Sequence, residues 1–176
     1  VEPGPTPPRP QVEGADRTQW IVAIPQVAIG QGDRRISARK VPSLPTLLGV
    51  PVYVAACSAP PTSVLAVIDG ADGAEVAGVL ACDVARASRA HLTLLLVRLE
   101  DESEPLDQAA FIQSYARNTG LGIVEVVELV NPGRNAIERA VRGPFQLVVA
   151  PAIGHALHGR DLAELVASGD ASVMLA

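Results

Sequence analysis

The chain has few side chains whose type and position could carry chemistry, and Asp69 is the first of them. It follows the apolar, β-branched run 63–68 and precedes Gly70. A carboxylate at the end of an apolar strand could hydrogen-bond a ligand. The same residue type before a glycine is also a common cap for a turn that enters a helix. The residues alone leave both interpretations open.

A second group of polar side chains lies between residues 154 and 161. His155 and His158 are three positions apart and Asp161 follows closely, so these three side chains could in principle hold a metal ion. Two solvated loop histidines explain the same pattern more simply. Arg160, near the expected start of a helix, could hold an anion or be an ordinary surface arginine.

Nothing in the sequence indicates catalysis. Ser63, Ser88 and Ser168 have no recognisable histidine and acid partners, and no glycine-rich segment leads into a lysine as in a phosphate-binding loop. Cys57 and Cys82 are too few and too far apart for a disulfide framework or a metal clip, so we expect small buried hydrophobic residues at both positions. We therefore expect a protein that is not an enzyme and holds no metal.

Composition excludes several classes of protein. Hydrophobic residues make up 48% of the 176 residues and charged residues only 19%, which is enough for a packed core and excludes disorder throughout the chain. The net charge of −5 argues against a nucleic-acid partner, because phosphate binding needs a concentrated basic patch. No apolar run reaches the roughly 18–20 residues of a membrane span, so we expect a soluble segment.

Strand-like and helical patterns alternate regularly after residue 62. The strand-like runs are continuously apolar, which is typical of a parallel sheet covered by helices on both faces. The sequence therefore predicts an α/β fold with an open, doubly wound sheet of five parallel strands, whose ligands would bind at the carboxyl ends of the strands. The expected strands are 63–68, 91–97, 121–130, 145–150 and 171–176, and the expected helices are 74–89, 107–118, 131–142 and 160–167.

An internal echo indicates a partial repeat ahead of this domain. Residues 21–30 and 147–154 both consist of an apolar strand, a proline, a short apolar bridge and a glycine, and each is followed by an arginine-containing stretch and a last strand. We therefore expect three regions: a proline-rich linker at 1–18, a strand–helix–strand half-domain at 19–57 and a complete domain at 63–176. We also expect the chain to be a fragment that starts midway through a tandem.

The last strand of the half-domain, Val50–Ala56, is apolar and should not remain an exposed sheet edge, because such an edge invites aggregation. We expect it to pair with the closing strand, Ser172–Ala176, either within the chain or across a dimer.

Four segments within residues 63–176 are characteristic of a known family: Val64-Leu-Ala-Val-Ile-Asp69-Gly70, Ala85-Arg-Ala-Ser-Arg-Ala-His-Leu-Thr-Leu-Leu-Leu-Val97, Asn131-Pro-Gly-Arg-Asn-Ala-Ile137 and Leu147-Val-Val-Ala-Pro151. Through these segments, residues 63–176 resemble the universal stress protein superfamily. The resemblance implies a five-stranded sheet of order 3-2-1-4-5 and, in many members, homodimers joined through the last strand. Some members bind ATP or AMP and others bind no nucleotide.

The loop that binds phosphates in nucleotide-binding members is degenerate here. Pro151 stands where the resemblance places the first glycine, and proline has no amide hydrogen to offer a phosphate. Gly154 matches the second glycine, but Gly159-Arg160 replaces a more distant glycine and hydroxyl pair. Asp69, at the position that meets the adenine base, is retained. Asp69, Gly154, Gly159 and Arg160 are thus the candidate nucleotide-binding residues.

These features together favour a non-catalytic regulatory domain without a cofactor. The resemblance implies the cytosolic tail of a membrane transporter, such as a cation/proton (Na+/H+) antiporter, with a cytoplasmic location, or a free-standing stress protein that binds ATP or AMP. The expected partners are a second copy, joined through edge strands, and the membrane part of the same transporter. Nucleic acid is not expected as a partner.

Overall fold

The structure is a computed structural model that describes residues 21–30, 36–56, 59–122 and 124–176. The expected linker 1–18 and Cys57 lie outside these residues. We call residues 21–56 the half unit and residues 63–176 the complete unit. The half unit contains β1 (Val22–Pro25), the 3-10 helices η1 (Gln26–Ala28) and η2 (Ala38–Ser43), α1 (Leu44–Leu48) and β2 (Val52–Ala55). The complete unit contains β3 (Ser63–Ile68), α2 (Ala74–Ser88), β4 (His91–Arg98), α3 (Glu104–Asn118), β5 (Val124–Val130), α4 (Arg134–Val141), β6 (Leu147–Ala150), α5 (Gly159–Ser168) and β7 (Ser172–Leu175).

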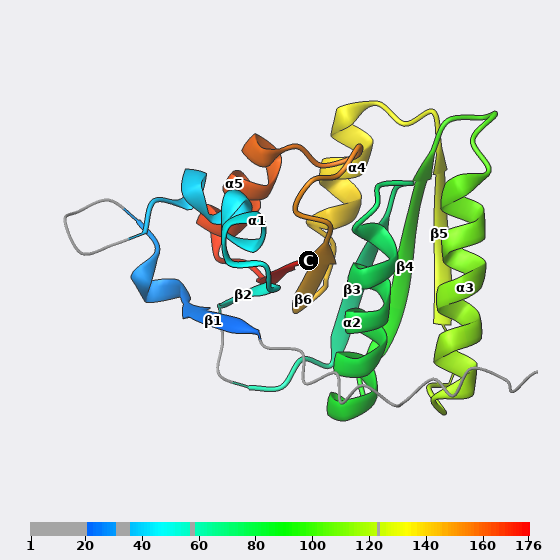
Figure 1. Cartoon of the computed structure of the whole chain (residues 1–176), viewed down its shortest axis with the longest axis horizontal. Helices are drawn as coiled ribbons and strands as arrows, with labels where there is room; N and C mark the ends of the chain where they lie inside the picture. The colour runs from blue at the N-terminus through cyan, green and yellow to red at the C-terminus, as the bar shows by residue number, and fades with distance from the viewer. Residues whose placement is uncertain (1–20, 31–35, 57–58, 123) are drawn as a thin grey trace, which may run out of the picture.

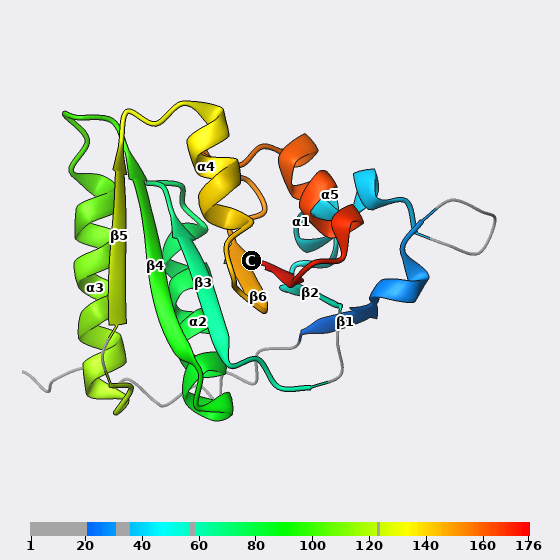
Figure 2. The same cartoon turned by 180° about the vertical axis from the view of Figure 1, so that it is seen from behind.

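Both units share one seven-stranded sheet of order β1-β2-β7-β6-β3-β4-β5 (Figures 1 and 2). Within the complete unit, all neighbouring strands are parallel. Counted along that unit, the strand order is 3-2-1-4-5, so the predicted α/β fold and its strand order are confirmed. The order reverses between β3 and β6, which is where ligands of such sheets usually bind.

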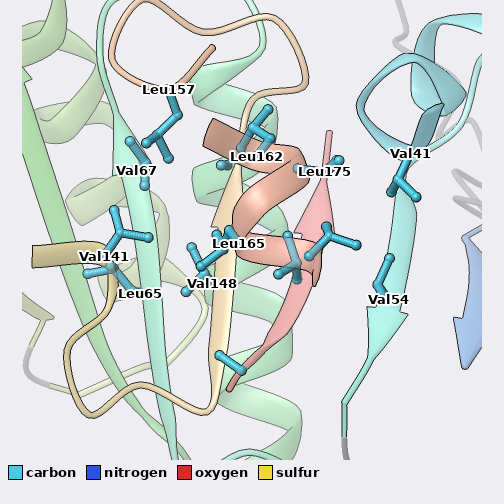
Figure 3. Packing of buried hydrophobic residues seen from close by; sticks show 14 of the residues in the cluster. Val41, Val54, Leu65, Val67, Val141, Val148, Leu157, Leu162, Leu165 and Leu175 are labelled. Atoms are coloured by element: carbon cyan, nitrogen blue, oxygen red, sulfur yellow. The ribbon is translucent and has the colours of Figure 1, made fainter. Parts of the chain in front are cut away.

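The core has two layers because the strands bury side chains on both faces. Alternate residues of β3 point to opposite sides: Val64, Ala66 and Ile68 face the layer of α2 and α3, while Leu65 and Val67 face the layer of α4 and α5. Figure 3 shows the second layer, in which α5 lies over β6 and β7. The half unit extends this layer, because Val41, Val52 and Val54 belong to the same buried cluster (Val41 and Val54 are labelled in Figure 3).

The half unit joins the sheet through β2. β1 and β2 are parallel, whereas β2 and β7 are antiparallel, so the expected pairing of Val50–Ala56 with Ser172–Ala176 is confirmed within the chain. The antiparallel ladder is symmetric about its central pair. It pairs Val52 with Leu175, Tyr53 with Met174 and Val54 with Val173.

The two parallel ladders on either side of this junction follow the same symmetry. Val22 is opposite Val52 in β2, and Val148 is opposite Val173 in β7, so a twofold rotation about the Tyr53–Met174 pair places β1 on β6. The proline that ends β1 and the proline that follows β6 also occupy equivalent positions. The equivalent positions are Ile21 and Leu147, Val22 and Val148, Ala23 and Val149, Ile24 and Ala150, and Pro25 and Pro151.

Three local expectations are corrected. Helix α3 begins at Glu104 rather than Asp107, with Pro105 in its first turn. Helix α4 begins at Arg134 after Gly133, so Pro132 precedes the helix instead of opening it. Strand β5 is not buried on both faces, because it lies at the sheet edge and most of its side chains are exposed.

Helices α2 and α3 are packed closely around Gly78 and Cys82. A Cβ atom on Gly78 would lie 2.2 Å from Cδ1 of Ile112, so the glycine allows the two helices to approach. Cys82 is fully buried, as expected for a small hydrophobic residue. Burial and, to a smaller degree, the nearby Asp83 carboxylate raise the pKa of the Cys82 thiol from 9.0 to about 11.

The raised pKa of Cys82 predicts a loss of stability in alkaline solution. Because the unfolded chain releases the thiol proton at a lower pH than the folded protein, the free energy of unfolding falls as pH rises from 9 to about 11. The variant Cys82→Ala has no thiol at this position and therefore lacks this pH dependence. The difference in free energy of unfolding between wild type and this variant should therefore fall by up to roughly 2–3 kcal/mol over that range.

Denaturant unfolding of both proteins at several pH values measures this difference. Tyr115, whose pKa is raised by burial and by its bond to Asp83, is present in both proteins, so its contribution cancels except for the smaller part of its pKa shift that Cys82 causes. A difference that stays constant from pH 8 to 11 would contradict the prediction.

Candidate functional site

The candidate site is built around the carboxylate of Asp69, which directly follows β3. The residue is only 3% exposed. One oxygen, Oδ2, accepts hydrogen bonds from the backbone N–H groups of His155 at 2.7 Å and Ala156 at 2.8 Å. The other, Oδ1, accepts one from the backbone N–H of Ala71 at 3.3 Å. Asp69 thus caps its own turn and also holds the loop between β6 and α5.

Gly154 allows this contact. A Cβ atom at position 154 would lie 2.7 Å from Oδ2 of Asp69, which is closer than real Cβ contacts allow. Of the four candidate residues, Asp69 and Gly154 therefore do come together, through a contact within the protein.

The turn after β3 is fixed from its other side by Gln108 of α3, which the sequence gave no reason to single out. This buried side chain accepts a hydrogen bond from the N–H of Gly70 at 3.1 Å and donates one to the carbonyl of Ala71 at 3.1 Å. Gly70 has a φ of +79°, a conformation that glycine adopts without strain. A polar residue within an amphipathic helix is ordinary, so only the tertiary contact reveals this role.

Gly159 and Arg160 lie apart from Asp69, at the start of α5. The space around a Cβ at Gly159 is open, so no close approach requires a glycine there. The side chain of Arg160 is 80% exposed, and its Nε donates to Oε1 of Glu164 one turn later, at 3.0 Å. Arg160 is therefore a surface arginine paired within its own helix.

The polar groups at the start of α5 already have partners within the protein. Oδ2 of Asp161 accepts a hydrogen bond from the backbone N–H of His158 at 3.0 Å, and Oδ1 forms an ion pair with Arg134 at the start of α4. Asp161 is thus engaged in capping and in an ion pair. Within the described parts of the chain, no group of three or more histidine, cysteine, aspartate or glutamate side chains could hold a metal ion.

Two cavities adjoin the loop that Asp69 holds, and His155 lines both of them. One, of about 260 Å³, is lined by Asp69 and His155 together with the carboxyl end of β4 and the segment before α4. The other, of about 490 Å³, lies between the β3–α2 turn, the loop after β6, and α1 with the segment that joins it to β2. Gly159 and Arg160 line a third cavity, of about 860 Å³, against η2. Gly154 and Gly159 share a further cavity, of about 500 Å³, which neither Asp69 nor Arg160 lines. The four candidate residues therefore do not surround one common space.

The strand order of the complete unit is the order that the resemblance to universal stress proteins predicts. Residues 63–176 have a universal-stress-protein-like fold. No family profile and no curated protein matches the chain. Among solved structures, the chain is similar to a universal stress protein crystallised in complex with cAMP, with 20% identity, coverage of 67% of this chain and 98% of that chain, and a TM-score of 0.49.

The loop after β6 offers little to a phosphate. Its first position is Pro151, which has no N–H, and the N–H groups of His155 and Ala156 already bind an internal carboxylate. An anion that bound these two amides would have to displace a buried carboxylate or lie beside its negative charge, and both cost free energy. The arrangement therefore favours a closed loop over an anion-binding loop.

Proposed function

We propose that this chain is a non-catalytic, stress-protein-like regulatory domain that works without a bound nucleotide. The observation that carries the proposal is the pair of hydrogen bonds from His155 and Ala156 to Asp69. In this proposal an internal carboxylate takes the place of a ligand phosphate, so the loop is already ordered in the free protein. Such a domain would act through contacts with other protein surfaces, which must differ between two states.

A thermal denaturation series with ATP, AMP and cAMP, each with and without magnesium, tests the proposal. A ligand that binds the native state raises its stability, by about 2.7 kcal/mol when its concentration is 100 times its Kd. We expect no shift in the midpoint temperature at millimolar concentrations of any of the three. A concentration-dependent rise with one of them would overturn the proposal.

One observation favours a nucleotide-binding stress protein as the second candidate function. The cavity of about 260 Å³ lies beside Asp69, near the point where the strand order reverses. Its volume is just below the range of roughly 300–1,000 Å³ that small-molecule sites usually occupy. Under this candidate, AMP or cAMP would stabilise the protein in the same denaturation series, and Asp69→Ala would abolish the effect.

The finer part of the proposal is that the domain regulates a membrane transporter, such as a cation/proton antiporter, from the cytosolic side. The resemblance and the half unit that precedes the complete unit support it. Among the described residues, no helix is both long and apolar enough to cross a membrane. Sequencing the complete reading frame tests this part. We expect roughly ten or more apolar segments of ~20 residues in the same polypeptide, and their absence would contradict it.

A further inference from the structure

The outer edge of β1 differs from the corresponding edge of its symmetry equivalent, β6. β6 lies between two strands, β7 and β3, whereas β1 pairs with β2 alone among the described residues. The exposed fractions of equivalent residues differ accordingly. Leu147 and Val148 of β6 are buried, but Ile21 and Val22 are 40% and 37% exposed. The same kind of apolar strand is thus covered in one unit and left open in the other.

The hydrogen-bonding groups of β1 are also only half used. The N–H of Val22 donates to the carbonyl of Pro51 at the start of β2, at 3.1 Å. In a parallel ladder, alternate residues direct their N–H and carbonyl groups to opposite neighbours. Ala23, one residue further along, therefore presents its N–H and carbonyl to the outer edge, where β6 would meet β3.

The sheet has a second edge, β5, which carries protection that β1 lacks. Glu125 and Glu128 lie within β5, and charges on an edge strand discourage pairing with another chain. β1 has the sequence Val-Ala-Ile-Pro, and its only protective residue is Pro25, at its end. Of the two edges, β1 is the one whose composition accepts another strand.

From this asymmetry, we propose that the outer edge of β1 binds an uncharged apolar strand in parallel, namely the opening strand of a further stress-protein-like unit. The register follows from β6, where Val64, Leu65 and Ala66 of β3 lie opposite Leu147, Val148 and Val149. The incoming strand would place its equivalent residues opposite Ile21, Val22 and Ala23. The half unit would thereby gain the neighbour that β6 has in the complete unit.

Other occupants fit less well. A second copy of this chain cannot supply the strand, because its own β3 is already paired with β4 and β6. Residues 1–20 contain five prolines and no apolar run comparable to β3. The strand must therefore come from a further unit with a β3-like sequence.

A fluorescent peptide with the sequence of residues 62–70 and a lysine tail serves as the probe, and fluorescence anisotropy measures its binding to the full 176-residue chain.

Ala23→Pro removes the outward N–H while leaving the ladder to β2 intact. Val126→Pro is the matched control on β5. The N–H of Asn131 donates to Arg98, so alternation directs the N–H of Val126 to the free side of that edge.

We expect the peptide to bind, Ala23→Pro to weaken binding by roughly tenfold or more, and Val126→Pro to leave it unchanged. A peptide with N-methylated backbone amides should not bind. Hydrogen exchange at Val22 checks that β1 stays paired in Ala23→Pro, and Val22→Lys, which adds a charge at the same edge, is a second variant that should weaken binding.

Three results would overturn the proposal. The first is no binding of the peptide, and the second is equal weakening by Ala23→Pro and Val126→Pro. The third is self-association of the chain that Ala23→Pro abolishes, because a second copy would then occupy the edge. The nucleotide series does not bear on this edge, so the failure of one proposal can be told from the failure of the other.

Discussion

A shortened chain that begins at Ala59 is expected to self-associate more strongly than the full chain. The truncation removes β2, which pairs with β7, and so leaves β7 as an open edge. All four residues of β7 are buried in the full chain, and none is charged. An uncharged, apolar edge strand pairs readily with a second copy or aggregates. Light scattering across a concentration series should therefore show dimers or larger species for the shortened chain at concentrations where the full chain shows fewer.

Val173→Pro in the shortened chain provides the control. The N–H of Ser172 donates to the carbonyl of Gln146, just before β6, and the N–H of Ala176 donates to the carbonyl of Ala150, at the end of β6. Because alternate residues point to opposite neighbours, the N–H of Val173 faces the side from which β2 has been removed. Proline at this position removes the donor and should reduce self-association without removing the ladder to β6. If the shortened chain is as soluble as the full chain and has the same oligomeric state, the half unit does not protect β7.

Asp69→Ala is expected to lower the free energy of unfolding by about 2–4 kcal/mol. The substitution removes the acceptor of the two short bonds from His155 and Ala156 and of the longer bond from Ala71. Hydrogen bonds to charged groups contribute roughly 1.5–3 kcal/mol each, but water can partly replace the acceptor at the half-exposed loop. The midpoint temperature should fall by about 2–4 °C for each kcal/mol lost.

Asp72→Ala, in the same turn, is the matched control. Asp72 is exposed, and its replacement should change the stability by less than about 0.5 kcal/mol. Hydrogen exchange adds a local readout, because the amides of His155 and Ala156 should lose protection in Asp69→Ala and keep it in Asp72→Ala. If Asp69→Ala is as stable as wild type, the carboxylate does not hold the loop, and its retention would have to be explained by a ligand.

The elements of the complete unit could be predicted because each depends on local composition. Strands such as β3 and β6 are buried on both faces, so nearly every residue must be apolar, and that run is visible without any knowledge of its neighbours. Helix boundaries that depend on capping residues were harder to predict from the sequence. Gly133 precedes α4, whereas Pro132 had been expected to open it, because either residue fits the first positions of a helix.

The echo between residues 21–30 and 147–154 also carried structural information. The aligned prolines, Pro25 and Pro151, end equivalent strands, because a proline lacks the N–H that would extend the ladder. The pairing of β2 with β7 was expected because both are apolar strands that need a partner, whereas its antiparallel direction came from the structure. Whether the partner lay in the same chain required the tertiary structure, since an edge strand can pair within or between chains.

By itself, the sequence determined the α/β class and most of the strands and helices of the complete unit, because these depend on apolar periodicity and on prolines and glycines. Only the tertiary structure decided what Asp69 does. Its partners, the amides of His155 and Ala156, are distant in sequence and have no side-chain signature, since any residue except proline has a backbone N–H. The fold also places Gly154 against that carboxylate, whereas Gly159 has open space around it and Arg160 lines a cavity that neither Asp69 nor Gly154 lines.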